Sequence, residues 1–225
     1  MKTYKIKFED LDYKSKRNIY REYSNKDEIK HCIETVADEI YNKFTNVPSN
    51  IDNFQIEWNQ IVKYLTEGYI AFEIMYDDSF KNIIGLKELD PLTLVPSYEK
   101  GKMVWHQYSE HPTMKRLLYD GQVIMISYQD MNMNQSYVDS LIRPYNILKA
   151  MESLYVIGNS NIDSADVEYA ESKFFISSRI PKMFRKFGIE SIQPRVDARF
   201  EKFTNKHFEN IYKIYDKIKD IQSKI

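Results

Sequence analysis

The stretch YIAFEIMY, residues 69–76, is nearly continuously apolar and ends at DDS, residues 77–79. A second apolar run, residues 83–89, stops at Asp90-Pro91. Asp, Ser, Gly and Pro favour turns, and short apolar runs between such turns are typical of β-strands. Four more runs of this kind follow, at residues 94–98, 103–108, 114–119 and 122–128. The sequence therefore predicts an antiparallel β-meander.

Helical periodicity comes before the meander. Asn25 can cap a first helix with Glu28 three residues on, and apolar residues then recur at helical spacing up to Phe44. A second helix is predicted from Asp52 to Gly68, because glycine suits the position that follows a helix. Residues 1–24 have weak periodicity, so we expect an arm or a short edge element there.

Helical periodicity also follows the meander. Helices are predicted over residues 136–157 and 163–179, joined by the linker 158–161 and packed as an antiparallel pair. Pro144 falls inside the first of them and should kink it or mark its first turn. The fold class predicted from all these patterns is α+β: one antiparallel β-sheet flanked by helices, with a long amphipathic C-terminal helix.

The C-terminal helix carries a seam close to a heptad repeat. About 30 residues of such a helix would be roughly 45 Å long. It can pack on its own domain, or against copies of itself in a ring or bundle, in which case its last turns are exposed in an isolated subunit. The candidate oligomer interface consists of the isoleucines near its end: Ile211, Ile214, Ile218, Ile221 and Ile225.

Composition excludes several classes of protein. The chain has 225 residues, with 32 basic and 33 acidic side chains, so no overall charge attracts it to nucleic acid or membranes. Cys32 is its only cysteine, which excludes an intramolecular disulfide and fits a reducing cytoplasm. No apolar run is long enough to span a bilayer, and a charged N-terminal segment argues against a signal peptide.

Residues suited to catalysis are scattered. There is no glycine-rich phosphate loop and no nucleophile elbow, and the adjacent Asp77 and Asp78 read as turn residues. His106 and His111 flank a turn but lack a third metal ligand nearby. We therefore expect no cofactor, no metal and no enzymatic activity. The basic cluster Lys182, Arg185 and Lys186 is either a solvated helix end or a weak contact to a DNA backbone.

Three stretches resemble the portal vertex protein of contractile-tailed bacteriophages. Residues 20–24 and the helix after them resemble a tyrosine-rich arm before the first wing helix, and residues 68–91 resemble the wing sheet with its Leu-Asp-Pro turn. The most specific match is SYVDSLIRPYNIL, residues 136–148, with Met151-Glu152, which is similar to the start of the stem helix. Residues 166–184 and 199–203 resemble later helices of the family.

One long section of the family is missing. Residues 157–162 stand where portal proteins have most of the paired stem helices, the clip and the channel loop. This section is naturally absent, was removed, or is supplied by another chain. The resemblance implies three regions: a wing-like α+β region at 1–135, a shortened stem and wing helix pair at 136–187, and a crown-side helix at 188–225.

The resemblance also implies partners. A portal protein forms a homo-oligomeric ring, a dodecamer in this family, at one vertex of the virion capsid, where double-stranded DNA passes without sequence specificity. Its partners there are the major capsid protein and the scaffold, whereas docking of terminase and tail adaptor cannot be carried over because the clip is absent. The alternatives are another phage structural or adaptor protein, a portal remnant that no longer forms a channel, and an enzyme.

Overall fold

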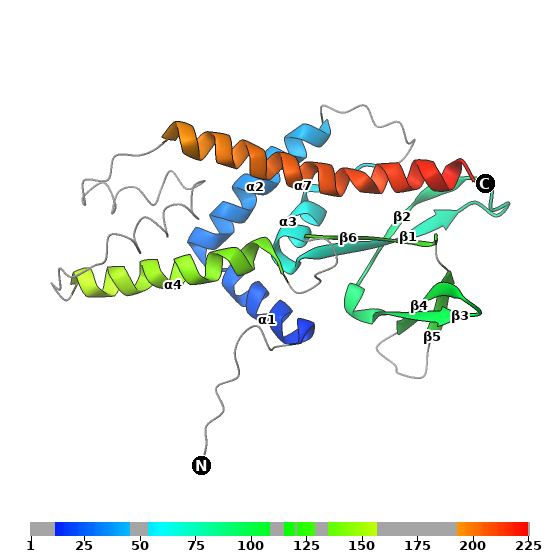
Figure 1. Cartoon of the computed structure of the whole chain (residues 1–225), viewed down its shortest axis with the longest axis horizontal. Coiled ribbons are helices and arrows are strands. Elements are labelled where there is room, and N and C mark those ends of the chain that lie inside the picture. Colours follow the sequence, from blue (N-terminus) through cyan, green and yellow to red (C-terminus); the bar gives the residue numbers. More distant parts are fainter. Residues whose placement is uncertain are drawn as a thin grey trace, which may run out of the picture.

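Helices precede and follow six strands in the computed structural model, which describes residues 12–45, 54–108, 115–119, 121–128, 135–156 and 193–224 (Figure 1). The predicted α+β class is confirmed, with antiparallel strands, flanking helices and a long C-terminal helix. In chain order the elements are α1 (Tyr13–Ser24), α2 (Asp27–Thr45), α3 (Trp58–Glu67), β1 (Tyr69–Tyr76), β2 (Ile83–Leu89), the short 3-10 helix η2 (Pro91–Thr93), β3 (Leu94–Glu99), β4 (Lys102–Tyr108), β5 (Lys115–Tyr119), β6 (Val123–Ser127), α4 (Tyr137–Val156) and α7 (Gln193–Gln222).

The strands form two three-stranded antiparallel sheets, in the orders β2-β1-β6 and β3-β4-β5, where a single sheet was expected. The division occurs at η2. The Asp90 side chain accepts a hydrogen bond from the Leu92 backbone N–H at 3.0 Å, and Pro91 lies in the first turn of η2. This turn redirects the chain, so that β3 begins a second sheet instead of extending the first.

Strand β1 is apolar except for Glu73 because both of its faces are buried over residues 69–74. Ile70, Phe72 and Ile74 pack with the helices in the main core. Ala71, on the opposite face, packs with Leu94, Trp105 and Leu118 of the second sheet in a smaller core. Sheet β2-β1-β6 therefore lies between a helical layer and sheet β3-β4-β5, and alternation along the strand distributes its side chains between the two cores.

The helix boundaries follow from local capping. α3 begins at Trp58, where Glu57 and Gln60 form a capping box, rather than at the predicted Asp52. Its end at Gly68 is confirmed, since this residue has the left-handed φ of 89° that glycine adopts easily. The expectation of an arm over residues 1–24 is wrong for residues 13–24, which form α1, with the Asp12 side chain accepting from the Ser15 backbone N–H at 2.7 Å.

The predicted helix over residues 136–157 is confirmed as α4, which contains Pro144. Its start is capped as expected, because the Asp139 backbone N–H donates to the Ser136 hydroxyl at 3.2 Å. The proposed partner helix at 163–179 and the linker before it lie outside the described residues. The antiparallel pairing of the two helices therefore stays a prediction.

Candidate interaction surface

The isoleucine stripe of α7 lies inside its own chain. Ile211, Ile214 and Ile218 have no exposed surface and pack in the main core, where α7 contacts α2 and β6. Ile221 is half-buried against the same core, and Ile225 lies outside the described residues. The proposed oligomer interface is therefore wrong for the first three isoleucines, because their apolar surface is already used in folding.

The other residues singled out in the sequence do not form a site in the described part of the chain. Lys182, Arg185, Lys186 and His111 lie outside the described residues. His106 is buried on β4, and its Nε2 lies 3.4 Å from Glu99 Oε1. Among the described residues, no cluster of three or more His, Cys, Asp and Glu side chains could hold a metal ion, and no helix is long and apolar enough to cross a membrane.

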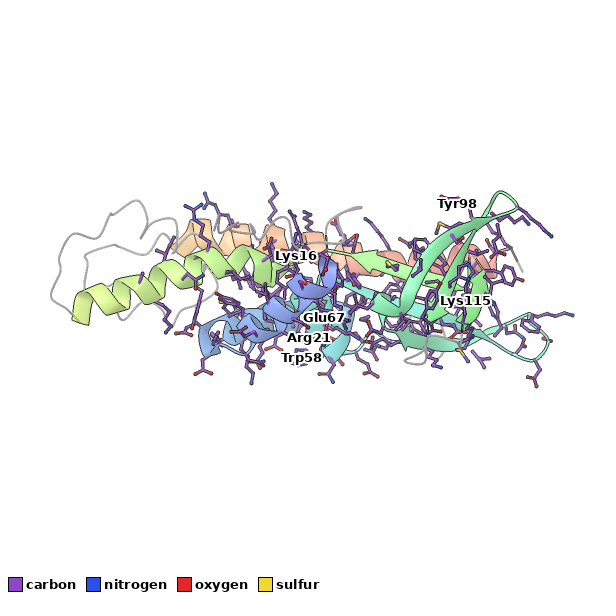
Figure 2. All side chains as sticks on the ribbon, turned by 90° about the horizontal axis from the view of Figure 1, so that it is seen from below. Lys16, Arg21, Trp58, Glu67, Tyr98 and Lys115 are labelled. Carbon is purple, nitrogen blue, oxygen red and sulfur yellow. The ribbon has the colours of Figure 1, made fainter. Side chains whose placement is uncertain are left out.

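A buried ionic cluster joins α1 to the end of α3. Arg17 Nε lies 2.7 Å from Glu67 Oε2, although not in line for a hydrogen bond, and Arg17 also donates to Asp90 at 2.9 Å. Arg21 donates to Glu67 Oε1 from two nitrogens, and Figure 2 shows these two labelled residues close together. Buried charges persist only when they are paired, so this cluster fixes α1 on α3 and on the turn after β2.

A second ion pair joins the two sheets. Glu73 is buried on β1, where its neighbours in sequence are apolar, and Arg116 on β5 donates to both of its carboxylate oxygens. A bidentate arginine satisfies a buried carboxylate with fixed geometry. This pair sets the position of sheet β3-β4-β5 on the first sheet.

His207 lies at the centre of a third buried group, between α7 and the end of β6. Its Nδ1 is 2.9 Å from the Tyr64 hydroxyl, and its ring stacks on Tyr128 with centroids 4.4 Å apart. The Asn210 side-chain amide donates to the same hydroxyl at 2.9 Å. Burial, with a smaller contribution from the charge of Lys206, lowers the pKa of His207 to about 3. His207 is therefore neutral in the folded protein and belongs to the core, where its role is structural.

The large hydrophobic side chains that are exposed among the described residues all belong to the region from β1 to β6, which includes the short helix η2, and none to the longer helices. They fall mainly into two groups. The first, which we call the hairpin tip, lies at the turn between β1 and β2 and consists of Met75, Phe80 and Ile84. The second includes Val95 and Tyr119 on the face of sheet β3-β4-β5 that is turned away from β1, which we call the outer face.

The hairpin tip has a fixed shape. The carboxylate of Asp77 accepts hydrogen bonds from the Ser79 hydroxyl, from the Lys81 backbone N–H and from both nitrogens of Asn82. The hydrogen bond from the Asn82 side chain contributes most to lowering the pKa of Asp77, to about 2, so this group stays charged. The loop holds Phe80 70% exposed at a φ of 56°, a left-handed conformation that is unfavourable for a residue of this size.

The outer face follows from the strand register. Val95 lies opposite His106, which lies opposite Leu117, while Val104 lies opposite Tyr119 in the next row. Tyr119 is 60% and Val95 44% exposed. Lys102 and Lys115 are exposed at the two ends of this face, and Lys115 lies 6.0 Å from the centre of the Tyr108 ring. Figure 2 shows Lys115 on this sheet and Tyr98 near the turn between β3 and β4.

Neither surface was expected from the sequence, although one signal was present. Phe80 is the one aromatic residue in the polar turn segment Asp78-Ser79-Phe80-Lys81-Asn82. Such a segment is not expected to form a buried strand or helix, so burial does not account for this side chain. The outer face could be recognised only once the register of the strands was known.

No protein-family model matches the chain, and no curated protein matches it.

Proposed function

We propose that this chain is a shortened portal-type subunit, which assembles as a homo-oligomeric ring at one vertex of a phage capsid. The segment with the most specific resemblance, residues 136–148, carries the proposal. It lies in α4, which begins in the main core at Tyr137, Val138 and Leu141. Figure 1 shows α4 running from there away from both sheets, an arrangement that suits a helix leading toward a stem.

The location of the exposed apolar side chains also supports assembly. Large apolar side chains that are exposed together in one region of a protein are typical of an interaction surface. The described residues present them on the strands and the turns between them, which correspond in the resemblance to the wing. The proposed ring performs no bond chemistry: it provides a symmetric opening for double-stranded DNA and a surface for the major capsid protein and scaffold.

The assembly state of the purified full chain tests this function. A ring with a central opening in negative-stain images, together with a single high-mass species in size-exclusion chromatography with light scattering, is the expected result. A monodisperse monomer at tens of micromolar would contradict the ring and favour a remnant that has lost assembly. Open filaments or dimers would instead favour another structural or adaptor role.

A further inference from the structure

We propose that the hairpin tip of one subunit docks on the outer face of sheet β3-β4-β5 of a second copy of this chain. The inference rests on the proposed ring and names the two surfaces that would form its contacts. Subunits in a closed ring meet head to tail, so each needs two different, complementary surfaces. The hairpin tip and the outer face are two such surfaces, each with exposed apolar side chains.

The hairpin tip presents an exposed aromatic side chain on a loop whose shape is fixed before binding. Phe80 is the most exposed of its apolar side chains, and the hydrogen bonds around Asp77 already hold the loop in shape. A rigid aromatic side chain loses little conformational freedom on binding, which is why such residues dominate interface energies. The left-handed backbone at Phe80 is unfavourable for the isolated chain. Burial of the ring against a partner would offset that cost.

The outer face offers the complementary chemistry. Val95 on β3 and Leu117 and Tyr119 on β5 are apolar, and the buried His106 and Val104 of β4 lie between them. The exposed side chains of Lys100, Lys102 and Lys115 border this face, at the β3–β4 turn and at the start of β5. The tip carries Asp77 and Asp78 with one lysine, Lys81, whereas the outer face carries these three lysines with one carboxylate, Glu99, so the two surfaces have net charges of opposite sign. This charge complementarity favours a second copy of the chain over a partner of unknown sequence.

Single cysteines beside the two surfaces test the pairing without altering their apolar residues. Lys81→Cys places a thiol next to Phe80, and Ser97→Cys places one on the outer face, on β3 two residues from Val95 and in the same row as Tyr119. The natural Cys32 does not interfere, because it is fully buried and burial raises the pKa of its thiol to about 12. A short bismaleimide reagent should cross-link a mixture of the two variants, and neither variant alone.

A matched mixture of Lys30→Cys with Ser97→Cys is the control, because Lys30 is exposed on α2, away from both surfaces. It should give no cross-linked dimer. Cross-linking of Lys81→Cys with itself would overturn the proposal, since it would mean that two tips meet symmetrically. A wild-type ring without cross-linking of the mixture would overturn the pairing alone, whereas a wild-type monomer would overturn both the pairing and the ring.

A substitution at Phe80 gives a second test that does not depend on cross-linking. Phe80→Asn removes the ring, and asparagine tolerates the left-handed backbone, so the subunit should melt at the same or a higher temperature. Association should weaken about 30-fold or more, as it does when a buried aromatic anchor is truncated. Phe80→Tyr, which keeps an aromatic ring, should associate like the wild type. Unchanged association of Phe80→Asn would refute the docking.

Discussion

Acidification should destabilise this protein through His207, well before its carboxylates are protonated. The pKa of His207 is lowered from 6.5 to about 3, chiefly because burial disfavours the charged ring. Below pH 6.5 the unfolded chain therefore binds a proton that the folded chain does not, and stability falls as pH falls. With these two pKa values, the free energy of unfolding at about pH 5 is about 2 kcal/mol lower than at about pH 7.5.

The hydrogen bonds around the ring are compatible with its neutral form. With Nδ1 of His207 unprotonated, the Tyr64 hydroxyl can donate to it while accepting from the Asn210 amide. A proton on Nδ1 would require the Tyr64 hydroxyl to turn its own proton away, and the imidazolium charge would lie in a pocket lined by Tyr128 and Phe203. Burial therefore opposes the imidazolium form, and the hydrogen-bond pattern suits the neutral one.

Urea unfolding followed by circular dichroism at the two pH values measures this effect. His207→Asn is the matched variant, because its amide oxygen can accept from Tyr64 near the position of Nδ1 but cannot titrate in this range. The variant should be less stable at neutral pH and should lose about 2 kcal/mol less than the wild type on acidification. Equal losses in both proteins would show that His207 is not held neutral, and would refute the reasoning.

Three further changes test the contacts that position the sheets and helices, each measured by urea or thermal unfolding. Arg17→Met should lower the free energy of unfolding by about 3 kcal/mol, because the buried Glu67 then keeps only one of its two arginines. Arg21→Met should lower it much less, since the Arg21 side chain is 52% exposed, and equal losses would contradict the burial argument. Arg116→Ala should cost about 1–3 kcal/mol by leaving Glu73 buried and unpaired, and adding Glu73→Gln should recover part of that loss. Gly68→Ala should cost at least about 2 kcal/mol, since φ is 89° and the new Cβ would lie 2.2 Å from the Gln135 carbonyl oxygen; an unchanged melting temperature would refute that close approach.

The sequence predicted the elements better than their assembly. The six strands, α2 and α4 follow from apolar runs and turn residues, which are local signals. Helix α1 was missed because the positions that it buries hold Lys16, Arg17 and Tyr20, which do not form an apolar stripe. Arg17 can be buried only because Glu67 and Asp90 lie nearby in the fold. The separation into two sheets likewise depends on which strand pairs with β1, and local patterns do not specify that.

The candidate site was predicted less well, for a related reason. The periodic isoleucines of α7 fit either a core or an interface, because both bury an apolar stripe. Only the positions of α2 and β6 decide that Ile211, Ile214 and Ile218 are core residues. Exposure, which distinguishes Phe80 and Tyr119 from buried aromatic residues, is a property of the folded chain. The residues to which we assign docking could therefore be identified only from the structure.

The position of α7 has a consequence for how the chain is made. This helix covers α2 and β6, and the Tyr215 hydroxyl accepts from the Ile56 backbone N–H, which lies 159 residues earlier. A ribosome adds roughly 5–20 residues per second, so the 30 residues of α7 take roughly 2–6 s to synthesise after the rest. During that interval the apolar faces of α2 and β6 remain exposed to solvent. Nascent chains halted before α7 should therefore be held by chaperones, and release should coincide with the arrival of α7.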